Sequence, residues 1–156
     1  MSNFTIQPTS ADDVAGLKTV LDLTDLFPSE MLLDLLRPAL EGETDALWLT
    51  YLRHQEAVGL CYVVPEEMAQ GTWNIRALAV RPDLQGRGIG TALVRAVEQR
   101  LKDKQQRILI VDTSGADGFA RARDFYARNG FEKEARIRDF WAFGDDKVTF
   151  WKALAQ

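Results

Sequence analysis

The most constraining feature of the sequence is a set of three glycines, each separated by one residue, in "QGRGIG" at positions 85–90. The stretch before it, Thr72–Val80, is strand-like and stops at "RP", and the stretch after it has apolar residues at helical spacing. Glycine costs roughly 0.5–1 kcal/mol relative to alanine in regular structure, so the three need a reason. Backbone amides that converge at a helix start bind phosphate, and glycines let the phosphate approach.

The spacing of these glycines excludes two common phosphate-binding motifs. A Walker loop ends in Lys-Ser or Lys-Thr, whereas here Gly90 is followed by Thr91 with no lysine. A dinucleotide fingerprint needs its third glycine three residues after the second, and Thr91 stands three residues after Gly88. What remains is Gln85, two residues, Gly88, one residue and Gly90, placed between a strand and an amphipathic helix.

The remaining periodicity predicts an α/β (α+β) fold in one domain, residues 1–156. The expected strands are 4–7, 46–52, 57–64, 72–80, 107–111, 132–142 and 147–152, and the expected helices are 10–23, 29–41, 89–101 and 119–129. We expect Pro38 to kink or divide the second helix. The β-α-β unit around the glycines should contain a parallel strand pair.

Composition excludes several classes of function. The 156 residues carry 19 Lys+Arg and 23 Asp+Glu, so a net charge of -4 argues against nucleic-acid binding. No apolar run approaches the roughly 20 residues of a membrane span. Cys61 and His54 are single, which excludes a Cys/His metal cage and predicts an inert buried thiol at Cys61. We expect a cytoplasmic protein without metal.

Two segments resemble a known family. "LAVRPDLQGRGIGTALV" resembles the coenzyme A signature of the GNAT superfamily of N-acetyltransferases, and "RDFYARNGF" at 123–131 resembles its second signature, a tyrosine-bearing helix followed by Gly-Phe. The order of expected elements is also similar, so the resemblance covers nearly the whole chain, more weakly before Ala46. It implies a mixed, mostly antiparallel sheet of about seven strands with a splayed central parallel pair, flanked by about four helices.

The resemblance implies acetyl-CoA as the acyl donor. Its pyrophosphate would bind the amides from Gln85 to Gly90, and its pantetheine arm would pair with the strand end at 78–80. The residues expected to contact the cofactor are Leu78, Ala79, Val80, Gln85, Gly86, Arg87, Gly88, Ile89, Gly90, Thr91, Phe119 and Tyr126.

The resemblance also implies direct attack by an amine in a ternary complex. Phe119, Ala122 and Tyr126 share a helix face by spacing, and Tyr126 is the implied general acid for the coenzyme A thiolate. Many relatives place a glutamate on the central strand, but this chain has "WNIRA" at 73–77. The candidates for the base are therefore Glu67 and Asp112, with Glu66 beside them.

The acceptor is expected to be a small-molecule or peptide amine. Its pocket would be lined by residues of the variable half and of the central strands, namely Phe27, Met31, Trp48, Glu66 and Trp73. Exposed strand edges at the C-terminus could pair two copies into a homodimer. Two other functions remain open: a non-catalytic coenzyme A sensor or regulatory module, and a nucleotide-binding protein that uses the same loop.

Overall fold

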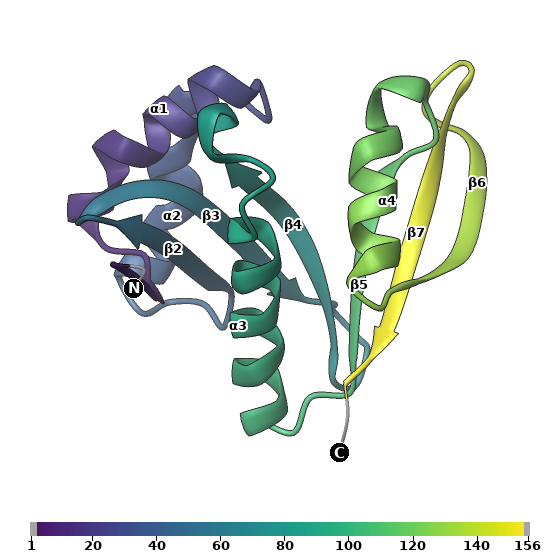
Figure 1. Ribbon diagram of the computed structural model, residues 1–156. Helices are drawn as coiled ribbons and strands as arrows, with labels where there is room; N and C mark the ends of the chain where they lie inside the picture. Colours follow the sequence, from purple (N-terminus) through teal and green to yellow (C-terminus); the bar gives the residue numbers. More distant parts are fainter. Residues whose placement is uncertain (1–2, 155–156) are drawn as a thin grey trace. The chain divides into compact units, whose positions relative to one another are not determined.

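The computed structural model describes residues 3–154, which form one seven-stranded sheet with four α-helices (Figure 1). The strands are β1 (Phe4–Pro8), β2 (Leu47–Arg53), β3 (Glu56–Pro65), β4 (Thr72–Val80), β5 (Ile108–Ser114), β6 (Glu132–Ala142) and β7 (Asp145–Ala153). The helices are α1 (Val14–Thr24), α2 (Leu32–Leu40), α3 (Ile89–Asp103) and α4 (Ala120–Arg128). The mixed sheet and four helices confirm the predicted fold.

The sheet has the strand order β1-β2-β3-β4-β5-β7-β6, and β4 and β5 pair in parallel. The parallel ladder joins Thr72–Ile75 to Ile108–Val111 and ends there, although β4 continues to Val80 and β5 to Ser114. The parallel pairing therefore stops before the carboxyl end of either strand. Contacts divide the chain into two compact units, and the boundary crosses β4 after Ile75 and α3 after Arg100.

The first unit, up to Val64 together with Arg76–Arg100, has a core between its helices and strands. The backbone N–H of Ser10 donates to the Asp13 carboxylate at 2.9 Å, so the helical segment begins where the sequence predicts. The fully buried leucines each stabilise the fold by about 1.5–3 kcal/mol. The core consists of Leu17, Val20, Leu21, Leu32, Leu36, Trp48, Ala57, Leu60, Ala77 and Ala79.

The second unit, Pro65–Ile75 together with residues from Leu101 onward, is built on β5, β7 and β6. Helix α4 lies alongside β7 (Figure 1), and the Tyr126 ring contacts the rings of Phe131 and Phe150. Gly130 ends the helix at φ +88°, the left-handed conformation predicted for it. The Lys152 ammonium then donates to the Asn129 carbonyl at 2.8 Å and holds the helix end to β7.

Pro38 does not divide the second helix: α2 continues through it to Leu40, since the proline removes one backbone hydrogen bond and the neighbouring bonds remain. The predicted end of the fifth strand was wrong. Strand β5 extends to Ser114, so Asp112 lies within the strand and not at its end. Pairing with β7, which reaches Ser114↔Lys147, supplies the extra ladder bonds. Within residues 3–154, no helix combines the length and apolarity needed to cross a membrane.

Candidate active site

The glycine loop between β4 and α3 is exposed at its centre and anchored at both ends. Residues 85–88 are exposed, whereas Leu84 and Ile89 on either side are buried. Gly86 and Gly88 adopt φ values of +80° and +84°, and a Cβ built on either would meet no atom within 4 Å. The backbone conformation therefore requires these two glycines, and open space lies where their side chains would be.

Gly90 differs from the other two because it lies in the first turn of α3. The first hydrogen bond of the helix runs from the Ala92 N–H to the Gly88 carbonyl at 3.0 Å. The N–H groups of the helix before Ala92 therefore have no acceptor within the helix. Such a helix start carries partial positive charge. The Gln85 side chain donates to the Val80 carbonyl at 3.0 Å and ties the loop to the end of β4. Together these features suit an anion such as a phosphate group.

Arg81 fixes the chain between β4 and the glycine loop. Its backbone N–H donates to the Val58 carbonyl, and its guanidinium bonds Glu56 at 2.7 Å and Asp83 at 2.8 Å. The hydrogen bond from Arg81 holds the pKa of the Asp83 carboxyl below its usual range, and the same bond raises the pKa of Arg81. Arg81 thus serves the conformation of the loop, while Arg87 at the loop centre is exposed.

The strand end before the loop alternates in burial. Ala79 is buried in the core of the first unit, and its neighbours Leu78 and Val80 are half-buried. The β4–β5 ladder has already ended at Ile75, so no ladder bond to β5 involves these three residues. Their edge is free of that pairing, which is the condition for a peptide-like arm to add along the strand.

Tyr126 lies in the second unit, on the face of the sheet that α4 covers. Its side chain is 7% exposed, and its ring lies 5.2 Å from Phe125, 5.6 Å from Phe131 and 5.8 Å from Phe150. Phe119 precedes α4 in a 3-10 turn and is 48% exposed. Because α4 begins only at Ala120, Phe119 lies before the helix and does not share a helix face with Tyr126 as expected.

A polar group that we call the Asn74 cluster (Glu66, Asn74, Asp112 and Thr149) occupies the other face of the sheet. The Asn74 amide nitrogen donates to Glu66 Oε1 at 2.8 Å and to Asp112 Oδ2 at 3.4 Å. The Thr149 hydroxyl donates to Asp112 Oδ1 at 2.6 Å. One amide therefore gathers two carboxylates that the sequence offered as candidate bases, Glu66, which was also expected to line the acceptor pocket, and Asp112.

The strand register places Tyr126 and the Asn74 cluster on opposite faces at the same level of the sheet. Val111 pairs with Ile75 in the last step of the parallel ladder and with Phe150 on β7, whose ring contacts Tyr126. Asp112 is the next residue along β5, so its side chain points to the other face. The two candidate proton-transfer groups thus flank the point where β4 and β5 stop pairing.

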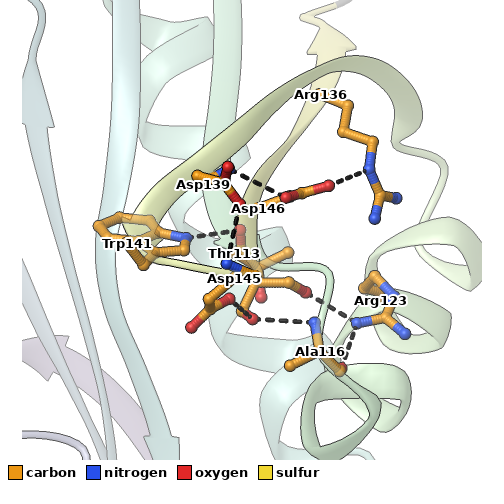
Figure 2. Close-up of polar contacts among 10 residues, drawn as sticks. Thr113, Ala116, Arg123, Arg136, Asp139, Trp141, Asp145 and Asp146 are labelled. Carbon is orange, nitrogen blue, oxygen red and sulfur yellow. Dashed lines mark hydrogen bonds and ion pairs between the residues drawn. The ribbon is translucent and has the colours of Figure 1, made fainter.

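The β6–β7 hairpin and the segment after β5 are joined by a polar network (Figure 2). The Trp141 indole donates to the Thr113 carbonyl at 3.2 Å, directly after Asp112. The Arg123 guanidinium donates to the Ser114 and Ala116 carbonyls, each at 2.7 Å. These bonds fix the path of the chain from the end of β5 into α4, and so the position of Tyr126.

The other predicted residues lie in different surroundings. Glu67 is exposed on the turn after β3, and the Asn74 amide bonds Glu66 and Asp112 and not Glu67. Trp73 is buried, and its indole donates to Gln106 Oε1 at 2.8 Å. In the first unit, Trp48 is buried against Tyr62, Phe27 is half-buried beside a shallow hollow, and Met31 is 45% exposed.

Sequence reasoning missed Asn74 and Thr149 as members of the site. Asn74 stands within "WNIRA", where a glutamate was sought, and an asparagine in the middle of a buried strand is the signal that could have indicated it. Thr149 gives no such signal, because threonine is common in strands. Only the pairing Asp112↔Thr149 between β5 and β7 reveals its role.

Comparisons with known proteins identify the family and the fold. The model of the acetyltransferase (GNAT) family matches residues 17–131. A GNAT-family structure from Desulfovibrio desulfuricans is 25% identical, with a TM-score of 0.90, and the match covers 98% of this chain and 100% of that one. No match was found among curated proteins.

Two more distant structures share the fold. The ribosomal-protein-S18-alanine N-acetyltransferase from Escherichia coli is 15% identical, with a TM-score of 0.79, and the match covers 99% of this chain and 96% of that one. An aminoglycoside 6'-N-acetyltransferase complexed with coenzyme A is also 15% identical, with a TM-score of 0.78 and coverage of 97% and 98%. Since the family model spans most of the chain and these folds match it almost end to end, the chain belongs to the GNAT family of acetyltransferases.

Proposed function

We propose that this chain is an N-acetyltransferase that moves an acetyl group from acetyl-CoA to a primary amine by direct attack in a ternary complex. The observation that carries the proposal is the loop at 85–90, whose positive-φ glycines open onto empty space before the start of α3. The coenzyme A pyrophosphate would bind the amides from Gln85 to Thr91. The pantetheine arm would add along Leu78–Val80, which the β4–β5 ladder leaves free.

The reaction needs one proton removed and one supplied. An amine with a pKa near ~10.4 must lose a proton before attack, which costs roughly 4.6 kcal/mol at pH 7. Asp112 is the proposed base, because Thr149 and Asn74 fix its carboxylate; Glu67 is the alternative. The amine nitrogen then bonds the thioester carbon, the carbon–sulfur bond breaks, and Tyr126 protonates the departing thiolate. The amide nitrogen releases its second proton to water, which reprotonates the phenolate.

Opposite placement of the two groups supports this assignment. Amine attack and thiolate departure occur on different sides of the reacting carbonyl carbon, so the base and the acid should flank it. Asp112 and Tyr126 lie on opposite faces of the sheet, at the level where the parallel ladder ends. A single positioned acid or base typically contributes 10²–10⁴ in rate.

The test is release of free thiol from acetyl-CoA with a panel of amines, run beside calorimetry of coenzyme A binding. The panel should include amino acids, polyamines, aminoglycosides and peptides with free N-termini. Coenzyme A binding with amine-dependent thiol release supports the proposal. Binding without turnover on any amine would favour the sensor alternative, and displacement of coenzyme A by ATP would favour the nucleotide-binding one.

A further inference from the structure

We propose that Asn74 receives the acceptor: its side-chain oxygen Oδ1 accepts a hydrogen bond from a primary amine or ammonium that enters the Asn74 cluster. The inference rests on the proposed acetyl transfer and deepens it by naming the residue that recognises the acceptor nitrogen. The contacts that define this site all lie within the second unit, and neither the glycine loop nor Tyr126 takes part in them.

The orientation of the Asn74 amide is fixed by its acidic neighbours. Its nitrogen donates to Glu66 Oε1 and Asp112 Oδ2, at 2.8 and 3.4 Å. A rotation of the amide by 180° would place Oδ1 against both carboxylates, where acceptor would face acceptor. Glu66 is thus a positioning residue, because its strong hydrogen bond determines which end of the amide remains available.

The available end has no partner within the described chain. Asn74 is 3% exposed, and Oδ1 is buried without a hydrogen bond to any of the residues 3–154. Buried polar atoms are bonded in the great majority of cases, and a buried acceptor without a donor is unfavourable. The missing partner must be a donor that enters the cluster, since the donors already present there are directed at Asp112 and Glu66.

The chemistry of the cluster favours nitrogen over oxygen as that donor. An ammonium group has three N–H donors and no acceptor, so it can bond Oδ1 and a carboxylate oxygen of Asp112 at once. A hydroxyl group has one donor and satisfies only one of them. The carboxylate also attracts a cation and would take its proton in the proposed reaction, after which the neutral amine can keep its bond to Oδ1.

A first experiment measures binding without turnover. In ¹H–¹⁵N spectra of the full chain with coenzyme A, the Asn74 side-chain signal is assigned by its loss in Asn74→Leu and followed during titration with butylammonium chloride. The matched control is butyltrimethylammonium chloride, which has the same charge and no N–H. We expect a saturable shift with the first ion and none with the second. Equal shifts with both, or no shift with butylammonium, would overturn the assignment.

A second experiment separates recognition from structure. Asn74→Leu should raise KM for the amine at least tenfold and leave KM for acetyl-CoA within twofold, as expected for a lost hydrogen bond to a charged donor. Asn74→Asp alone places a carboxylate next to the Glu66 carboxylate and should also weaken binding of the amine. Combining it with Glu66→Gln restores a donor between the two side chains and should recover amine binding.

The outcomes of the second experiment are decisive in both directions. Recovery in the double variant supports the hydrogen-bonded orientation, whereas a double variant no better than Asn74→Asp contradicts it. If no amine supports thiol release, the proposed function fails on its own. The titration with butylammonium still decides whether Asn74 receives an amine, because it needs no reaction.

Discussion

The ring of Tyr126 lies 5.8 Å from the ring of Phe150, and this contact holds the phenol on the α4 face of the sheet. Phe150 pairs with Val111, which belongs to the last step of the parallel ladder. Tyr126 is thereby set at the level where the β4–β5 ladder ends. The position of the proposed general acid thus depends on β7, which follows it in the chain.

Replacing Tyr126 by phenylalanine should separate chemistry from packing. The ring contacts with Phe131 and Phe150 remain, so we expect the protein to stay folded, kcat to fall about 10²-fold and coenzyme A affinity to stay within twofold. Tyr51→Phe is the matched control, because Tyr51 lies on β2 and stacks on Phe4. Steady-state kinetics with calorimetry provide the measurement. An unchanged kcat would remove Tyr126 from the mechanism.

Adding a methyl group at Gly88 should weaken coenzyme A binding. Gly88 has φ +84° and open space around a Cβ, so Gly88→Ala imposes backbone strain of about 1 kcal/mol and places a methyl where the phosphate would approach. Gly144→Ala is a close control, because Gly144 has φ +82° and equally open space in the β6–β7 turn. Both variants should lose similar unfolding free energy, measured in urea. Calorimetry should show at least tenfold weaker binding for Gly88→Ala alone; equal affinities would contradict the loop site.

The hairpin should respond to acid through Asp146 (Figure 2). The Asp139 backbone N–H, at 3.0 Å, and the Arg136 guanidinium, at 2.6 Å, lower the pKa of the Asp146 carboxyl below its ordinary value. A carboxyl whose pKa is lower in the folded state stabilises the fold at every pH above its unfolded-state pKa. That stabilisation is lost as the pH falls through the folded-state pKa. Asp146→Asn should therefore cost stability at pH 7 and progressively less below pH ~4. Urea unfolding across this range checks it; a difference independent of pH would rule out the linkage.

The thiol of Cys61 should be inert while the protein is folded. Cys61 is fully buried on β3, and burial raises the pKa of its thiol to about 12, so the reactive thiolate is scarce at pH 8. We expect no reaction with an aromatic disulfide reagent in buffer and one equivalent in concentrated urea. Rapid labelling of the native protein would show that β3 opens far more readily than its packing implies.

The sequence was sufficient to predict β4, the conformation of the glycine loop and the end of α4, because local rules control them. The Arg-Pro pair after Val80 predicted the end of β4, and the glycines at 86 and 88 adopt the positive φ that only glycine adopts without strain. The C-terminal glycine of α4 followed the same rule. Local conformation depends on neighbours in the chain, so these features could be predicted without a fold.

The Asn74 cluster was decided by the tertiary structure alone. Glu66, Asn74, Asp112 and Thr149 come from four separate places along the chain, and they meet because β4, β5 and β7 are neighbours in the sheet. The sequence determined which side chains could carry charge or accept protons. Strand order and register determined which of them share a face, and a shift of register by one residue would have turned Asp112 toward Tyr126 and away from Asn74.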